Sequence, residues 1–342
     1  MNKRYKNFCL SLVGIVHILL TDQSRLLAAV TAHQPVVQVI APASKTPTWE
    51  LAAATAYINQ RLNWHAYFPK EIYGTDLFYA NNDEARAQAL IKALTGEGTW
   101  LWAMRGGYGS ARLIPYLERL PEAVKAQIKC GPKKTIIGYS DITALQLYLY
   151  QQYGWPALQA AMLSEIVNQK VSPHSVAQLT ELITQQPSSR TIPHLTSINL
   201  KADQPMAPLT GMVVGGNLTL VEISLGTCWQ IDARNNFLFL EDIGLSAVDL
   251  ERRLDHLRQA KVIDEVKAVI FGEFISTESA KLLTQVKQRF AQQVAVPVFS
   301  VAGIGHSYIK TPLPLYTQAS LQASEQQVGY FSLTVASPHQ GE

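Results

Sequence analysis

The strongest constraint on the fold is an alternation of short apolar runs with helical stretches, which begins near residue 36. Val36–Ala41 is an apolar run rich in β-branched residues, and Thr99–Met104 and Thr135–Ile137 are similar. Helices are predicted at Trp49–Leu62, Asp83–Leu94 and Ile142–Tyr153. Strands that alternate with helices predict an α/β fold with a parallel sheet covered on both faces. Such sheets bind ligands at the carboxyl ends of their strands.

The second half of the chain predicts another unit. We interpret residues 164–205 as a connection between domains, because one helix, Val176–Gln185, is followed there by a stretch rich in proline and serine. We therefore expect an N-terminal domain at 36–163 and a C-terminal domain at 206–336. Its expected elements are strands at Leu209–Val214, Phe237–Leu240 and Ala268–Phe271, a turn at Gly215–Asn217, helices at Asp249–Ala260 and Ser279–Gln293, and short strands after Pro297.

Residues 1–32 have the pattern of an export signal. A basic start (Lys3, Arg4, Lys6) precedes the apolar run Phe8–Leu20, and Val30-Thr31-Ala32 resembles a cleavage site. We expect a signal peptide at residues 1–32 and a periplasmic protein without stable membrane insertion after cleavage. The alternatives are a misassigned start with a cytoplasmic protein, or an uncleaved anchor.

Composition excludes several classes of protein. Hydrophobic residues make up 47% and charged residues 16% of the 342 residues, which excludes a disordered or fibrous chain. Without residues 1–32, 25 of the 29 basic and 25 of the 26 acidic side chains remain. This balance gives no electrostatic reason to expect a nucleic-acid partner. Cys130 and Cys228 are expected to be two buried thiols, and pairing after export is the alternative.

The first candidate for chemistry is Gly138-Tyr139-Ser140-Asp141, between a predicted strand and a predicted helix. A serine on such a turn presents its hydroxyl at the carboxyl end of the strand, and the following N–H can serve as an oxyanion donor. The alternative is an N-cap, in which Ser140 or Asp141 accepts from free N–H groups of the helix.

A second candidate is the loop Arg105-Gly106-Gly107-Tyr108-Gly109, which follows another predicted strand. Its glycines allow the backbone to approach a ligand closely, so it could supply a second oxyanion donor beside Ser140. A phosphate cradle is a competing function, although the spacing fits neither common phosphate-binding motif. A tight connection without function is the other alternative.

An acid and a base are predicted in the second unit. Glu241 ends a buried strand, where a carboxylate needs a partner, and the adjacent Asp242 could fill the same role. Among the eight histidines, His306 is the best candidate because it follows Gly303-Ile304-Gly305. Serine, acid and base in this order are compatible with a catalytic triad. No motif supports a metal.

Together these residues resemble the LD-carboxypeptidases (muramoyltetrapeptide carboxypeptidases), a family of serine peptidases that includes the microcin C self-immunity peptidases. The resemblance spans about residues 36 to 322. It rests on five blocks: Val39–Pro42, Asn82–Arg86, Arg105–Ser110 with Arg112-Leu113, Ile137–Leu145, and Gly215–Leu218 through Gly226-Thr227 to Leu240–Asp242.

The resemblance implies a nucleophile at Ser140, an acid at Glu241 and a base at His306, with oxyanion donors at Asp141 and Gly107. It also implies a doubly wound N-terminal domain, a smaller mixed α/β C-terminal domain, an active site at their interface, no cofactor and a homodimer. This chain departs from the family pattern after Asp242 (Ile243–Ser246) and after His306 (Ser307–Lys310), so the wall of the substrate pocket is expected to differ.

The expected activity is hydrolysis of the amide between an L-centre and the terminal D-alanine of murein tetrapeptides. Arg105 and Asn217 are the candidate anchors for a free carboxylate and a diaminopimelate side chain. One alternative is a microcin-immunity type of peptidase that acts on peptide-nucleotides. The other is a non-catalytic periplasmic binding protein, in which Ser140 would only cap a helix.

Overall fold

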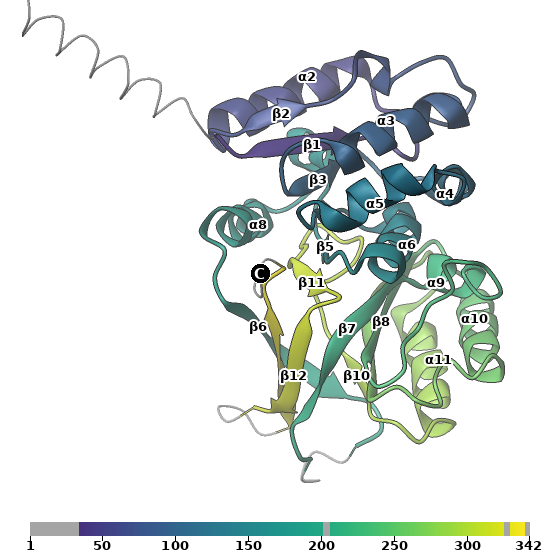
Figure 1. The fold of residues 1–342 in the computed structure, drawn as a ribbon. Helices are drawn as coiled ribbons and strands as arrows, with labels where there is room; N and C mark the ends of the chain where they lie inside the picture. Colours follow the sequence, from purple (N-terminus) through teal and green to yellow (C-terminus); the bar gives the residue numbers. More distant parts are fainter. Residues whose placement is uncertain (1–33, 201–205, 325–328, 339–342) are drawn as a thin grey trace, which may run out of the picture.

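The computed structural model describes residues 34–200, 206–324 and 329–338. Its first sheet has six strands in the order β11-β5-β4-β3-β1-β2, and all neighbouring strands are parallel except β11, which is antiparallel to β5 (Figure 1). The strands are β1 (Val36–Ile40), β2 (His65–Tyr67), β3 (Trp100–Ala103), β4 (Thr135–Ile137), β5 (Ala157–Gln159) and β11 (Leu313–Leu315).

Helices cover both faces of this sheet, as a doubly wound fold requires. Alternate residues of β3 pack into different hydrophobic clusters: Leu101 and Ala103 lie in one with residues of α3, and Trp100 and Trp102 lie in the other with residues of α2. The helical elements are α2 (Thr48–Ala56), η1 (Tyr57–Arg61), η2 (Lys70–Ile72), α3 (Asp83–Thr95), η3 (Ser110–Leu113), α4 (Ile114–Glu118), α5 (Glu122–Cys130), η4 (Ser140–Ile142), α6 (Thr143–Tyr153), α7 (Leu163–Val167) and α8 (Pro173–Gln185).

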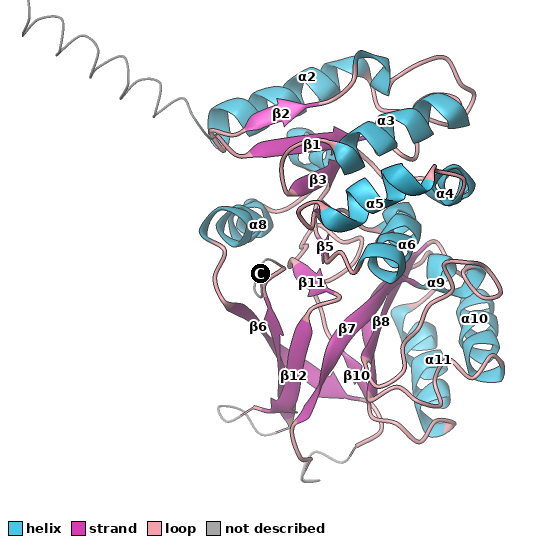
Figure 2. Cartoon of the chain, viewed as in Figure 1, coloured by secondary structure: helices cyan, strands magenta, loops and turns pink. Residues whose placement is uncertain are grey.

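The second sheet closes into a barrel in the order β10-β6-β13-β12-β7-β8-β9. Helices α10 and α11 lie side by side against it (Figure 2), and Phe290 of α11 packs edge-on against Phe271 of β9, with ring centroids 5.6 Å apart. The elements are β6 (Ser189–Ser197), β7 (Leu209–Asn217), α9 (Leu218–Ile223), β8 (Phe237–Ile243), α10 (Ala247–Gln259), β9 (Ala268–Ile275), α11 (Ala280–Gln292), β10 (Val298–Ser300), β12 (Gln318–Ala323) and β13 (Tyr330–Ala336).

The predicted fold class is confirmed, but several elements differ from the prediction, and β2, β5 and α5 were not predicted at all. The region 164–205 contains β6, a barrel strand with only Ile192 and Leu195 buried, so its apolar pattern is weak. Gly215–Asn217 is not a turn, because these residues continue β7 in parallel register with β8. The chain also returns to the first sheet through the three-residue strand β11. The domain boundaries remain predictions.

The expectation of buried thiols is wrong. Cys130 and Cys228 are both exposed and unpaired. Cys130 is the last residue of α5, whose buried face is provided by Ile128, and Cys228 lies in the turns that follow α9. No helix in the described ranges is long and apolar enough to cross a bilayer. The predicted leader, residues 1–32, lies outside the described residues.

Candidate active site

Ser140 stands on a strained turn between β4 and α6. Its φ is +62°, in the left-handed region that non-glycine residues seldom adopt and that carries a strain of about 1–3 kcal/mol. It is the first residue of the short helical turn η4, directly after Tyr139 in extended conformation. At the carboxyl end of a parallel strand, this conformation exposes the serine hydroxyl in the same way as the sharp strand-to-helix turn of a nucleophile elbow.

The capping alternative does not fit the hydrogen bonds. Neither η4 nor α6 has a side-chain cap at its N-terminus. The carboxylate of Asp141 instead accepts from the backbone N–H of Ser110 at 2.8 Å and from the Ser110 hydroxyl. Burial raises the pKa of Asp141, and these hydrogen bonds oppose the rise. The side chain of Asp141 therefore ties the nucleophile turn to the end of the glycine loop.

The glycine loop lies directly against Ser140. A Cβ atom added at Gly106 would stand 3.2 Å from the Cβ and 3.4 Å from the Oγ of Ser140. At Gly107, where φ is +110°, it would meet the hydroxyl of Ser44 at 2.2 Å. Gly107 thus needs glycine, whereas a side chain at Gly106 would require a shift of a few tenths of an ångström. Gly106, Gly107 and Arg105 line the same cavity as Ser140.

Glu241 and His306 form a pair in which the carboxylate is wholly buried. Oε2 of Glu241, near the end of β8, lies 2.7 Å from Nδ1 of His306, and the side chain of Glu241 has no exposed surface. Burial raises the pKa of Glu241, and the contact with His306 opposes this. Because Nδ1 is engaged with the carboxylate, Nε2 is the ring nitrogen left for proton transfer.

The two candidate acids, Glu241 and Asp242, are adjacent on β8 but have different contacts. Asp242 accepts from the side-chain amide of Asn217 at 3.0 Å and from the backbone N–H of Thr219 at 2.9 Å. The pairing of β8 with β9 is irregular between Leu240 and Asp242, and of the two carboxylates it is Glu241 that contacts His306. Asn217 is itself buried, and its side-chain oxygen accepts from Leu220 at the start of α9. Its predicted contact with substrate remains a prediction.

A cavity of about 220 Å³ brings the predicted residues from both halves together. Ser140 and His306 both line it, although no hydrogen bond joins these two side chains in the described part of the chain. Such contacts are often long in unliganded active sites. Residues that sequence reasoning did not assign complete the wall: Tyr139, Met162, Ser164, Glu165 and Lys170.

Tyr139 contributes a specific contact to this wall. Its ring packs edge-on against the imidazole of His306 with centroids 4.7 Å apart, and its hydroxyl donates to Glu165 at 2.6 Å. Burial raises the pKa of Tyr139, so the phenol remains a donor. Its position beside Ser140 in the motif was visible in the sequence, but nothing there indicated the contacts with Glu165 and His306.

One close approach holds the barrel against the nucleophile turn. A Cβ atom at Gly216 of β7 would lie 2.7 Å from the hydroxyl oxygen of Thr143, the first residue of α6. The next backbone N–H, that of Asn217, donates to the same hydroxyl at 3.2 Å. Gly216 therefore permits direct packing between the strand before α9 and the helix after Ser140.

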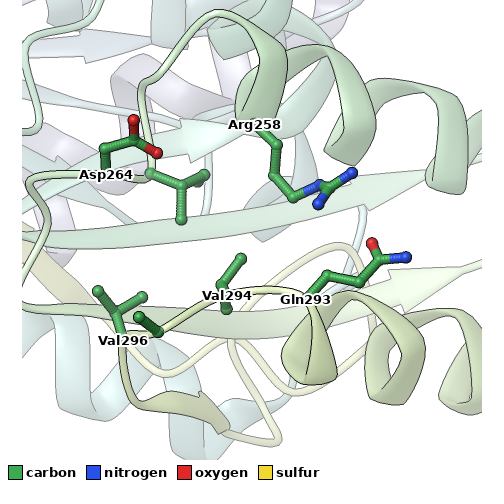
Figure 3. Close-up of a pocket in the computed structure, with 7 residues that line it drawn as sticks. Arg258, Asp264, Gln293, Val294 and Val296 are labelled. Atoms are coloured by element: carbon green, nitrogen blue, oxygen red, sulfur yellow. The ribbon is translucent and has the colours of Figure 1, made fainter.

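A larger cavity of about 350 Å³ lies elsewhere in the barrel domain (Figure 3). It is lined by Arg258 of α10, Asp264 and the segment from Gln293 to Val296. None of its lining residues is a serine, cysteine or histidine, so it offers no nucleophile and base. Among residues 34–200, 206–324 and 329–338, no group of three His, Cys, Asp or Glu side chains could hold a metal ion.

Comparison with known families agrees with this arrangement. The profile described as the LD-carboxypeptidase N-terminal domain matches residues 37–160, and the one described as the LD-carboxypeptidase C-terminal domain matches residues 210–321. The two matches cover the nucleophile turn and the acid, respectively, and His306 lies within the second.

Individual relatives point the same way. The chain is 36% identical over 250 residues to a Rickettsia conorii protein provisionally named a carboxypeptidase, covering 73% of this chain and 76% of that protein. It is 25% identical over 312 residues to the murein tetrapeptide carboxypeptidase of Pseudomonas aeruginosa, covering 84% and 93%. The crystal structure of muramoyltetrapeptide carboxypeptidase from Oxalobacter formigenes shares the fold, with a TM-score of 0.74, 24% identity, and coverage of 88% and 98%. The chain belongs to the LD-carboxypeptidase family.

Proposed function

We propose that this protein is a serine carboxypeptidase that releases the terminal D-alanine from murein tetrapeptides. The observation that carries the proposal is the 2.7 Å contact between His306 and the buried Glu241, in a cavity that also contains Ser140 at a positive φ. The murein tetrapeptide carboxypeptidase of Pseudomonas aeruginosa among the relatives supports the choice of substrate.

The proposed reaction proceeds through an acyl-enzyme. His306 takes the proton of the Ser140 hydroxyl as its oxygen attacks the carbonyl of the L–D amide bond. The imidazolium then gives this proton to the amine of D-alanine as the carbon–nitrogen bond breaks. Water, deprotonated by His306, attacks the ester, and the proton returns to Ser140 as the tripeptide leaves.

The surroundings suit each charge that develops in this reaction. The buried carboxylate of Glu241 stabilises the imidazolium form of His306. The backbone N–H groups of Asp141 and Gly107 are the proposed oxyanion donors, and loss of one such donor typically costs about 2.7–4 kcal/mol of barrier.

Arg105 is the proposed anchor for the carboxylate of D-alanine. It lines the cavity, and its guanidinium has no ion-pair partner in the described ranges. An arginine fits a carboxylate because two of its N–H groups match the two oxygens. Lys170, also in the cavity wall, adds a second positive charge nearby.

The test is mass spectrometry of murein tetrapeptide incubated with the purified protein that begins at His33. We expect loss of one alanine with wild type and no release with Ser140→Ala, whose circular dichroism should match wild type. Release that persists in the purified variant would refute the assignment of the nucleophile. Cleavage of an aminoacyl-nucleotide analogue in place of the tetrapeptide would favour the microcin-immunity type of activity.

A serine-directed fluorophosphonate probe separates an enzyme from a binding protein. We expect the probe to label wild type and not Ser140→Ala, whereas a periplasmic binding protein would not be labelled at all.

We further propose that the enzyme acts in the periplasm, and N-terminal sequencing of the protein from that fraction should begin at His33. A homodimer remains a prediction for light scattering to test.

A further inference from the structure

We propose that Lys310 and Glu165 are positioning residues, an ion pair that joins the loop carrying His306 to the turn carrying Ser140. The inference rests on the proposed function, because it gives the two residues a role in the chemistry of that site. The two side chains come from different parts of the fold, Glu165 from α7 and Lys310 from the segment before β11.

Lys310 is a buried cation with a defined set of contacts. Its side chain is 5% exposed, and its ammonium lies 3.5 Å from Oε1 of Glu165. The ammonium also donates to the backbone carbonyl of Ser307, directly after His306. The backbone N–H of Lys310 donates to the hydroxyl of Ser175 at 2.9 Å. The lysine thus fixes the end of the base-bearing loop at both its backbone and its side chain.

Glu165 carries the connection to the nucleophile turn. Its Oε1 accepts from the hydroxyl of Tyr139, and its Oε2 accepts from the backbone N–H of Met162 at 2.9 Å. Tyr139 precedes Ser140 and packs edge-on against His306. The ammonium of Lys310 also lies 5.4 Å from the centroid of the Tyr139 ring. One carboxylate therefore connects the elements that hold the nucleophile and the base.

This ion pair is better explained by the arrangement of the site that it fixes than by a contribution to the stability of the fold. Burying two charges carries a desolvation penalty that can exceed their attraction, so apolar side chains would often stabilise the fold as well. A pair with fixed hydrogen bonds instead specifies one arrangement of the groups it joins. Here those groups are the turn before Ser140 and the loop after His306, whose mutual placement determines the rate of proton transfer.

The first test compares Lys310→Met with Lys134→Met. Lys134 is also buried, but its ammonium donates to backbone carbonyls at Gly96 and Gly98, away from the cavity. We expect kcat for D-alanine release to fall by about tenfold or more in Lys310→Met, with KM changed less than about twofold. Lys134→Met should retain kcat. Equal losses in both variants, or none in Lys310→Met, would overturn the proposal.

The second test uses the pH profile, which a purely structural role would not move in opposite directions. Without Lys310, the negative charge of Glu165 favours the imidazolium, so the acid limb of kcat/KM should move to higher pH in Lys310→Met. In Glu165→Gln the uncompensated ammonium of Lys310 should move the acid limb of kcat/KM to lower pH. The Lys310→Met/Glu165→Gln double variant should return towards wild type. Shifts in the same direction, or no shifts, contradict the proposal.

The other charged or titratable groups around the His306 loop are not substituted in these variants, so they do not affect the comparison of pH profiles. They are Glu241 and Asp242 of β8, Glu273 of β9, whose Oε1 accepts from Gly303, the phenol of Tyr139, and Arg105 and Lys170 of the cavity wall.

A substrate-independent readout separates failure of this inference from failure of the proposed function. If wild type leaves the tetrapeptide intact, the proposed substrate is wrong, but phosphonylation of Ser140 by the fluorophosphonate probe, in which the serine oxygen displaces fluoride from phosphorus, still reports on the base. We expect slower phosphonylation in both Lys310→Met and Glu165→Gln than in wild type and Lys134→Met. Should Lys310→Met fail to fold, Glu165→Gln keeps the test decisive, because it preserves the size of the side chain. An unchanged rate of phosphonylation in that variant overturns the inference.

Discussion

The two halves of the molecule build their shares of the candidate site by different physical means. The N-terminal half uses backbone conformation: Ser140 is held at positive φ, and glycines let a loop lie against it. The barrel half uses a buried charge, because Glu241 has no exposed surface and contacts His306. The N-terminal share of the site therefore depends on local backbone geometry. The barrel share depends on the groups that surround the buried carboxylate of Glu241.

The two shares of the site should therefore respond differently to substitution. Changes at Ser140 and in the glycine loop should act through strain and clashes, which alter stability and placement together. Changes at Glu241 should act through charge, which can remove activity while the fold is unaffected or improved. The variants below test that division.

The largest effect is expected for Glu241→Gln. Loss of the charge should lower kcat by about 10⁴-fold, because the imidazolium loses its partner and its ring orientation. Because burial raises the pKa of Glu241, the native state holds this proton more tightly than the unfolded chain does. Its contribution to stability therefore falls as pH rises above the ordinary range for glutamate, and the glutamine variant lacks this loss. Urea unfolding at pH 5 and pH 7 should show that the free energy of unfolding changes less favourably with rising pH in wild type than in Glu241→Gln. A free energy of unfolding that is lower in the variant than in wild type at pH 7 would contradict this prediction.

Gly216→Ala tests the contact between the halves. The new methyl group would meet Thr143 at 2.7 Å at a φ of +140°, so β7 must move away from α6. We expect kcat/KM to fall by about 10- to 100-fold and the free energy of unfolding to fall by about 1–3 kcal/mol. Gly226→Ala is the matched control, since Gly226 also has positive φ but no atom within 4 Å of the added Cβ. Equal losses of activity in both variants would exclude a role for this contact in aligning the site.

Lys134 provides a buried charge in the N-terminal half that the site does not use. Burial lowers the pKa of Lys134 to about 8. Between that value and the ordinary pKa of lysine the unfolded chain binds more protons, so stability should rise with pH across this window, by roughly 1–3 kcal/mol. Lys134→Met should lack this rise. Chemical unfolding from pH 8 to pH 10 measures the slope, and equal slopes in the two proteins would show that this charge is not destabilised by burial.

The smallest effect concerns the strain at Ser140. Alanine keeps the side-chain penalty of positive φ, whereas glycine removes it, so Ser140→Gly should be more stable than Ser140→Ala by about 1 kcal/mol. The same pair at Ser164, inside α7, should show the opposite order, because glycine weakens a helix. Thermal unfolding of the four variants distinguishes these results. The same order at both positions would show that Ser140 is not strained.

The N-terminal share of the site was largely predictable because its information is local. The bounds of β4 match the predicted Thr135–Ile137, and Ser140 follows within three residues. The Arg105–Gly109 loop was likewise visible as a contiguous motif after β3. The sequence could not show that Asp141 would contact Ser110, since that contact joins positions 31 residues apart in the chain.

The barrel share was less predictable because its contacts span long distances in the sequence. The choice between Glu241 and Asp242 depends on which distant partner each side chain reaches, His306 for Glu241 and Asn217 for Asp242. Gly215 and Gly216 resembled a turn, but here glycine serves close packing against Phe239 and Thr143 within a strand. Strand β6 was overlooked because it is mostly exposed and contains Pro193.

The central claim is that Ser140 is activated by a base from the other half of the molecule. Peptide mapping after timed reaction with a fluorophosphonate probe tests this most directly. We expect one modified residue, Ser140, and much slower modification in His306→Ala than in wild type. Modification at another residue, or an unchanged rate at Ser140 without the imidazole, would contradict it.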